Sequence, residues 1–170
     1  MPIEVELYTA DHVIRGFLET AGDRLSDILN NKTESAILVG PAQVSRLLNL
    51  SKSPPTRLPL VRVEKKNLLF ALPVQHDLTH KSLYRRASRM MFQILVFVPN
   101  FELRGAIHLT ERLDIRRVLV VRPEDFVPLT DATATYVLYP QVTVKADTLV
   151  FNKAQVVFAG EERSELAPSP

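Results

Sequence analysis

The sequence predicts a mainly β protein, a tandem duplication of one small β-barrel-like unit with one connecting amphipathic helix. Two observations lead to this fold class. Short segments with apolar or alternating character, separated by turn residues, dominate the chain. The second half also repeats the residue order of the first, and a long internal repeat of this kind constrains the whole architecture.

Matching segments mark the repeat in the two halves. They are Arg15-Gly16 with Arg104-Gly105, 36–39 with 118–121, and 59–70 with 140–151. The last pair keeps a constant offset of 81 residues. Each copy has roughly 70 residues, which is close to the lower limit for an independent core, so the copies are expected to support each other.

The repeat divides the chain into four parts. The first β-rich repeat spans 1–73 and the second spans 91–159. A basic helical connector at 74–90 lies between them. Residues 160–170 are polar and contain prolines, which predicts a disordered tail.

The first copy is expected to begin with two strands. Residues 3–7 alternate apolar and acidic side chains, the pattern of a strand with one solvated face. Residues 13–20 predict a second strand, in which Gly16, like Gly105 in the second copy, indicates a bend or a close backbone approach. Residues 24–29 fit either a short strand or one helical turn, and periodicity does not separate the two.

A short buried strand and a hairpin are expected to complete each copy. Residues 36–39 form the strand, which Gly40-Pro41 ends. The charged triplet Lys65-Lys66-Asn67 lies between two apolar segments and predicts a hairpin turn. In the second copy the same turn is expected at Ala146-Asp147-Thr148.

The connector has a helical pattern. Lys81, Arg85 and Arg89 recur at four-residue spacing with Arg86 nearby, and apolar side chains take the opposite side. Such a face could bind the phosphates of nucleic acid or lipid. In the simpler interpretation, these charges pair with acidic residues of the flanking copies or keep the helix solvated.

Composition narrows the function classes. The 170 residues are 46% hydrophobic and 24% charged, as in ordinary globular proteins, and the net charge of +2 does not by itself indicate nucleic acid or membrane. The absence of cysteine excludes disulfides, thiolate-bound metal and cysteine nucleophiles. The acidic N-terminus does not resemble a secretory signal, and the longest apolar run is too short to cross a bilayer. A cytoplasmic protein without a transmembrane segment is therefore expected.

One segment carries a spacing that metal sites use. His76 and His80 are four residues apart and Asp77 follows the first, which is similar to the zinc-protease motif H-E-x-x-H. Asp is one methylene shorter than the Glu of that motif, and the sequence has no third metal ligand at a characteristic spacing from the two histidines. The simpler interpretation is a pair of solvated histidines, so no metal or cofactor is expected.

A charged set recurs in both copies and is the candidate ligand or partner surface. It comprises Arg15, Arg24 and Asp27 in the first copy and Arg104, Arg112 and Asp114 in the second. Two linked surfaces would raise the effective concentration for a second binding event. Alternatively, each set is an ion pair that closes a loop over its barrel, and such surface pairs contribute only about 0–1 kcal/mol.

The order of elements resembles the Sm-like and SH3-like small β-barrels, over residues 3–72 and 91–159 taken one copy at a time. Sm proteins carry a glycine in the second strand and an Asp shortly afterwards. Gly16 with Asp23, and Gly105 with Glu111, stand in similar places. The resemblance implies an RNA-contacting asparagine, for which Asn30 and Asn31 are the candidates in the first copy and the second copy has none.

A second resemblance rests on a shorter signature. The stretch Arg24-Leu-Ser-Asp-Ile-Leu-Asn30, after the strand Val13-Ile-Arg-Gly16, is similar to an uncharacterised bacterial domain family. That resemblance implies no activity.

These patterns favour a non-enzymatic binding or assembly module with two related surfaces, whose partner is another protein or a second copy of the chain. The sequence has neither a nucleophile elbow nor a phosphate-binding glycine loop among its five glycines. The alternative is an RNA- or DNA-binding protein that uses the basic connector helix and the Sm-like faces. A metal-dependent hydrolase at His76 and His80 is the third class.

Overall fold

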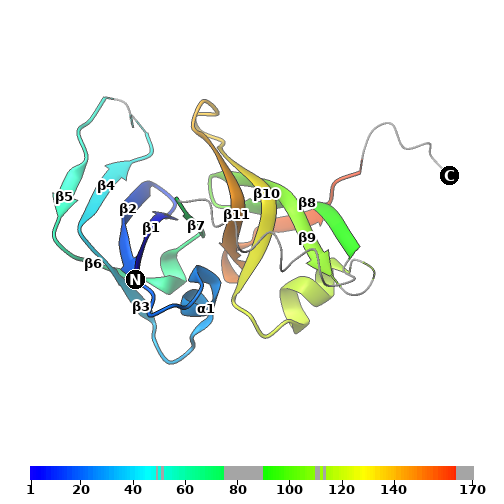
Figure 1. The fold of residues 1–170 in the computed structure, drawn as a ribbon. Helices are drawn as coiled ribbons and strands as arrows, with labels where there is room; N and C mark the ends of the chain where they lie inside the picture. The colour runs from blue at the N-terminus through cyan, green and yellow to red at the C-terminus, as the bar shows by residue number, and fades with distance from the viewer. Residues whose placement is uncertain (49, 51, 75–89, 110–111, 113, 164–170) are drawn as a thin grey trace.

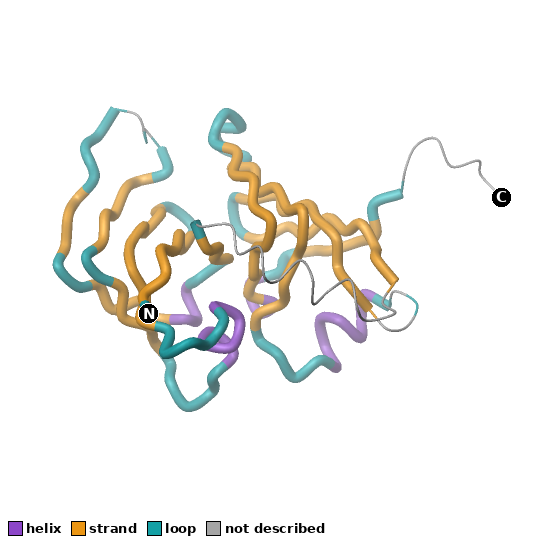
Figure 2. Tube along the Cα trace, viewed as in Figure 1, coloured by secondary structure: helices purple, strands orange, loops and turns teal. Residues whose placement is uncertain are grey.

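The chain folds as a mainly β protein with a few short helical segments, as the sequence predicts (Figures 1 and 2). The computed structural model describes residues 1–48, 50, 52–74, 90–109, 112 and 114–163. Residues 1–74 are called the first half below, and residues 90–163 the second half. No helix among the described residues has the length and apolar character needed to cross a membrane.

The strands of the first half are β1 (Pro2–Tyr8), β2 (His12–Glu19), β3 (Ala36–Val39), β4 (Ala42–Arg46), β5 (Thr56–Leu58), β6 (Val61–Glu64) and β7 (Phe70–Pro73). Those of the second half are β8 (Met90–Val98), β9 (Phe101–Leu109), β10 (Phe126–Tyr136), β11 (Thr143–Asn152) and β12 (Phe158–Glu161). The helical segments are α1 (Leu25–Asn30), the 3-10 helices η1 (Lys65–Asn67) and η3 (Lys153–Gln155), and the π-helical turn η2 (Arg117–Val121).

One antiparallel sheet runs through both halves. Its strand order is β12-β8-β9-β10-β11-β7-β1-β2-β4-β5, and β3 pairs with β6 in a separate two-stranded sheet. Strand β7 is the connection, because it pairs with β1 of its own half and with β11 of the other (Figure 1).

Strand register is the same in the two halves. Three strand pairs of the first half each have a counterpart in the second half. Val39–Val61 corresponds to Leu129–Leu149, Ala42–Leu58 to Ala132–Ala146, and Tyr8–Phe70 to Phe97–Phe158. Lys65 and Lys153, which begin η1 and η3, therefore correspond at an offset of 88 residues. The predicted offset of 81 is wrong, because Phe151 lies in β11 and pairs with Phe70 instead of taking its place.

Both predicted hairpins are wrong. Residues Lys65–Asn67 form η1, but the strands on either side of it pair elsewhere, β6 with β3 and β7 with β1 and β11. Strand β11 runs unbroken through residues 146–148, where Ala146 pairs with Ala132 and Thr148 with Thr130. A tight hairpin favours Gly or Asn at positive φ, which residues 146–148 lack, and the long pairing with β10 keeps them extended.

The apolar run 118–121, matched above to the strand 36–39, is helical. The carboxylate of Asp114 accepts hydrogen bonds from the backbone amides of Arg116 and Arg117, just where the chain enters η2. Val118 is buried, whereas Val120 is 71% exposed. The strand that takes the place of β3 and β4 is β10, as the shared register shows.

The predicted boundaries of the connector and the tail also change. Met90, placed at the end of the connector, begins strand β8. Gly160 and Glu161, placed in the disordered tail, belong to β12, where pairing with Leu95 and Ile94 of β8 holds them. The predicted connecting helix over 75–89 and the end of the tail, 164–170, lie outside the described residues.

The ambiguous segment 24–29 is resolved in favour of a helix, α1. Its Leu25 and Leu29, four residues apart, are both buried against the first half. The end of α1 is capped by Lys65, whose Nζ donates to the carbonyls of Ile28 (2.9 Å) and Asn31 (2.8 Å). Burial lowers the pKa of Lys65, with Glu34 and Asp125 acting in the opposite direction. In the second half, Lys153 Nζ donates in the same way to the carbonyl of Arg122 after η2.

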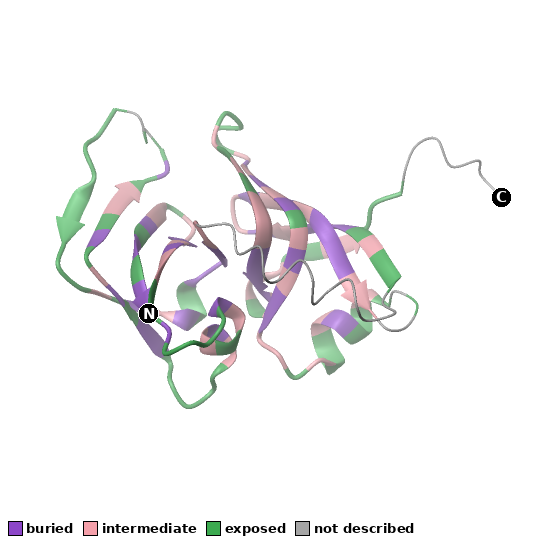
Figure 3. Ribbon diagram, in the orientation of Figure 1, coloured by how far each residue is buried: buried purple, intermediate pink, exposed green. Residues whose placement is uncertain are grey.

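Two hydrophobic clusters form the core, and both contain residues of both halves. The cluster in the first half includes Phe126 and Val150 from the second, and the cluster in the second half includes Tyr8, Phe70 and Leu72 from the first. Figure 3 shows buried residues on the strands of both halves. Because each core is completed by residues of the other half, the two halves stabilise each other.

The junction between the halves is also satisfied by hydrogen bonds. Asn152 is 3% exposed, its backbone amide donates to the carbonyl of Leu69 (2.9 Å), and its side chain donates to the carbonyl of Leu68 (2.9 Å). Asn30 of α1 donates to the carbonyl of Phe126 (3.1 Å) and accepts from its amide (2.8 Å).

Gly16 and Gly105 allow the close backbone approach that the sequence indicates. A Cβ atom at Gly16 would lie 2.7 Å from the carbonyl oxygen of Pro41, and one at Gly105 would lie 3.0 Å from that of Thr130. Each glycine therefore lets the neighbouring strand bend across β2 or β9 at the same place in its half.

Replacing Gly16 by Ala is expected to lower the free energy of unfolding by about 1–3 kcal/mol, because the methyl group would overlap backbone atoms that cannot move independently. Chemical denaturation followed by circular dichroism measures the change. Gly160→Ala is the matched control, since that strand glycine has no atom within 4 Å of the added Cβ. Equal stability of the two variants would contradict the close approach.

Candidate functional site

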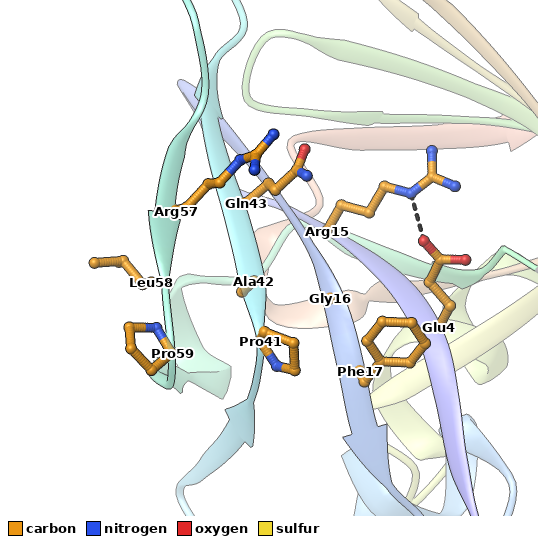
Figure 4. Close-up of a pocket in the computed structure, with 10 residues that line it drawn as sticks. All are labelled: Glu4, Arg15, Gly16, Phe17, Pro41, Ala42, Gln43, Arg57, Leu58 and Pro59. Carbon is orange, nitrogen blue, oxygen red and sulfur yellow. Dashed lines mark hydrogen bonds and ion pairs between the residues drawn. The ribbon is translucent and has the colours of Figure 1, made fainter.

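The site with the clearest geometry is an open pocket of about 800 Å³ on the outer face of the first half. Figure 4 shows it on strands β1, β2, β4 and β5. It is lined by Glu4, Arg15, Gly16, Phe17, Pro41, Ala42, Gln43, Arg57, Leu58 and Pro59.

Strand register places three hydrogen-bonding side chains in a row across the pocket. Arg15 of β2 pairs with Gln43 of β4, which pairs with Arg57 of β5. Directly opposed residues share one face of a sheet, so the three side chains extend from the same surface (Figure 4). Arg57, Gln43 and Arg15 are called the first row below.

Arg15 is held in place by carboxylates from β1. Its Nε donates to Glu4 at 2.7 Å, and its Nη1 lies 3.7 Å from Glu6. The hydrogen bond to Glu4 raises the pKa of the Arg15 guanidinium above its ordinary value. The Arg15 side chain is 50% exposed, so this network fixes its orientation while solvent still reaches it.

Glu6 connects this face to the junction between the halves. The hydroxyl of Tyr8 donates to Glu6 at 2.7 Å, and the Tyr8 ring stacks on Phe70 with centroids 4.4 Å apart. Burial, reinforced by the nearby carboxylate, raises the pKa of the Tyr8 hydroxyl above its ordinary value, so it remains a hydrogen-bond donor.

The second half presents a row at the corresponding positions. Arg104 of β9 pairs with Thr133 of β10, which pairs with Lys145 of β11. Lys145, Thr133 and Arg104 are called the second row below. Both rows have a cation at each end and an uncharged polar residue between.

Arg104 is also held by carboxylates, although they come from different strands. Its Nη1 donates to Glu102 at 3.1 Å within β9, and its Nε donates to Glu162, just after β12, at 3.3 Å. The hydrogen bond to Glu102 raises the pKa of the Arg104 guanidinium above its ordinary value. Each half therefore fixes the arginine of its row with two carboxylates.

The residues of the predicted charged set lie on different elements of the two halves. Arg15 and Arg104 lie in the rows, but their carboxylate partners are not Asp27 and Asp114. Arg24 and Asp27 are exposed at the start of α1, and Arg112 is exposed before η2. Asp114 accepts hydrogen bonds from the backbone amides of Arg116 and Arg117, as described above.

The residues that sequence reasoning missed lie on neighbouring strands. They are Glu4, Glu6, Gln43, Arg57, Glu102, Thr133, Lys145 and Glu162. Strand alternation places Arg15 and Phe17 on one face, which is a local signal. The facing residues of β4 and β5 follow only from the register, which the sequence did not supply.

The other candidates cannot be placed in the site. His76, His80, Lys81, Arg85, Arg86 and Arg89 all lie outside the described residues. Within the described part of the chain, no three His, Cys, Asp or Glu side chains come together as a metal site. The two histidines in the described part of the chain form hydrogen bonds with nearby side chains. His12 bonds to its sequence neighbour Asp11 (2.8 Å), and His108 bonds to Thr130 on the adjacent strand (2.7 Å). The chemistry that the rows offer is hydrogen-bond donation by exposed cations.

Known proteins provide no further guide to the site. No family model matches the chain, and comparison with curated proteins and with solved structures gives no significant match.

Proposed function

We propose that the protein is a non-enzymatic binding or assembly module that presents two related faces, one on each copy of a duplicated small barrel-like unit. The observation that carries this proposal is the shared register, which puts Arg57, Gln43 and Arg15 on one half and Lys145, Thr133 and Arg104 at the corresponding positions of the other. The matching glycines and lysine caps support a common origin for the two units.

The rows are suited to an acidic partner. Arg15 and Arg104 are fixed by carboxylates, whereas Arg57 is exposed at the open edge of its row, and Lys145 takes the corresponding place. Charge-assisted hydrogen bonds between such cations and carboxylates are stronger than neutral ones. We propose that the ligand is an acidic segment of a protein, bound in a cytoplasmic setting without a cofactor.

Two faces on one chain would act together. A partner with two acidic segments binds its second segment as an intramolecular event, so overall affinity rises with no new type of contact. This would explain why the rows are kept on both halves although the carboxylates that fix them differ.

A poly-glutamate peptide is the probe for this function. In NMR titration at low salt, amide shifts are expected along β2, β4 and β5 and along β9, β10 and β11. Arg57→Glu is expected to remove only the shifts along β2, β4 and β5, and Lys145→Glu only those along β9, β10 and β11. The double variant should remove both sets. Both groups should weaken as salt is raised, because the contacts are charged.

Lys32→Glu is the matched control, because it makes the same charge change at an exposed position outside both rows. It should leave the shifts unchanged. Shifts that ignore both row variants, or a single-stranded oligonucleotide that binds the rows where the peptide does not, would overturn the proposal. The second result would favour the nucleic-acid alternative.

A further inference from the structure

The junction between the halves is a strand pairing that has a counterpart at each end of the molecule. Inside the chain, β7 pairs with β11, with Ala71 opposite Val150 and Phe70 opposite Phe151. By the shared register, β12 takes the place of β7 in the second half. Likewise, β6 takes the place of the β11 segment that receives β7.

Both counterpart strands have an open edge. Among the described residues, β12 pairs only with β8 and β6 pairs only with β3, whereas β7 and β11 each have two neighbours. An edge strand offers unpaired backbone donors and acceptors to another chain. The molecule therefore carries the two sides of its own internal junction on separate surfaces.

At β12 and the residue before it, apolar side chains are exposed whose counterparts at β7 are buried. Phe158 is 54% exposed and Val157 is 62% exposed, whereas their counterparts Phe70 and Leu69 are 0% and 2% exposed. Burying an aromatic side chain and its neighbour is a substantial source of binding free energy. The exposed parts of Phe158 and Val157 form the surface that a partner strand would cover.

The aromatic stacking of the junction is already formed at β12. Tyr8 and Phe70 stack with centroids 4.4 Å apart, and Phe101 of the second half meets their edges. Phe97 and Phe158 stack in the same way, with centroids 4.9 Å apart and planes 4° apart. A preorganised pair costs less conformational entropy when a partner binds.

The receiving edge at β6 is flanked by exposed apolar residues. Leu38 of β3 is 53% exposed, Leu60 just before β6 is 60% exposed, and Leu58 of β5 is 38% exposed. The counterpart of Leu38 is Pro128, which is half-buried in the second half. An apolar strip of this kind beside an open edge is suited to a strand with exposed Phe and Val.

We propose that β12 of one molecule pairs antiparallel with β6 of a second copy, with Ala159 opposite Arg62 and Phe158 opposite Val63. The internal junction thus recurs between chains. This goes beyond the binding of an acidic segment and requires neither row. The interface is heterologous, so successive copies form either a closed ring or a filament.

The junction between chains is weaker than the internal one. Arg62, bonded to Glu64 at 3.0 Å, takes the place of buried Val150, and Glu64 takes the place of Asn152, which donates across the internal junction. Inside the chain, the side chain of Asn100 donates to the carbonyl of Ala10. Asp11 takes the place of Asn100 in the junction between chains, and this hydrogen bond is lost there because a carboxylate side chain cannot donate. Association is therefore reversible and depends on concentration.

Two variants each disable one side of the proposed interface. Phe158→Glu disables β12 and leaves the β6 edge intact, whereas Leu60→Glu disables the β6 edge and leaves β12 intact. Both positions are exposed, so the fold should be retained. Sedimentation velocity from micromolar to millimolar concentration should show oligomers for the wild-type chain, and weakening of about tenfold or more for each variant alone.

An equimolar mixture of the two variants separates this proposal from simple loss of folding. The mixture should form dimers and nothing larger. In each dimer, β6 of the Phe158→Glu chain pairs with β12 of the Leu60→Glu chain, and the two strands left unpaired are the disabled ones. Leu138→Glu, at an exposed apolar position in the β10–β11 turn, should associate as the wild type does. A wild-type chain that stays monomeric throughout, or a mixture that stays monomeric, would overturn the proposal.

The register is tested by cross-linking, which the absence of cysteine makes simple. Directly opposed residues of antiparallel strands have Cα atoms about 4.5–5.5 Å apart, within reach of a disulfide. A chain with Arg62→Cys should cross-link under mild oxidation to a mass-tagged chain with Ala159→Cys. Phe158→Cys, one residue out of register, should cross-link to Arg62→Cys far less. Equal yields would contradict the proposed pairing.

Discussion

Strand β7 pairs with β1 on one edge and with β11 on the other, and its alternate side chains enter different hydrophobic cores. Ala71 packs into the cluster of the first half, while Phe70 and Leu72 pack into that of the second. This is the period-two geometry of a strand used on both faces at once. Neither half can complete its core without this strand, so the position of each relative to the other is fixed by the same contacts that stabilise it.

The two outer faces depend on that arrangement. Glu6 binds both Arg15 in the first row and Tyr8 at the junction, so the orientation of the row is tied to the packing around β7. A shared register carries a second row to the corresponding place on the other half. Because β7 pairs with a strand of each half, the two rows are held at a fixed separation. Among the described residues, β6 and β12, which hold the corresponding register positions, each pair with one strand only.

The features predicted correctly from the sequence have local causes. Alternation identified β1 and β2, and glycine inside a strand pattern identified the close approaches at Gly16 and Gly105. The errors arise where distant segments decide the outcome. The repeat predicts a turn at residues 146–148, but pairing with β10 keeps them extended. Lys65 lies in a charged triplet but is buried because it caps α1. Arg15 was found as a candidate, while its carboxylates and its neighbours across the face required the register.

Scanning calorimetry at low protein concentration shows whether β7 makes the two halves one cooperative unit. One unfolding transition is expected, with calorimetric and van't Hoff enthalpies that agree, because neither core persists without the shared strand. Phe70→Ala should lower the midpoint of that transition without splitting it, since truncation of a buried Phe costs about 3–5 kcal/mol in the one structure. Two separate transitions, or a Phe70→Ala effect confined to one of them, would show instead that the halves unfold independently.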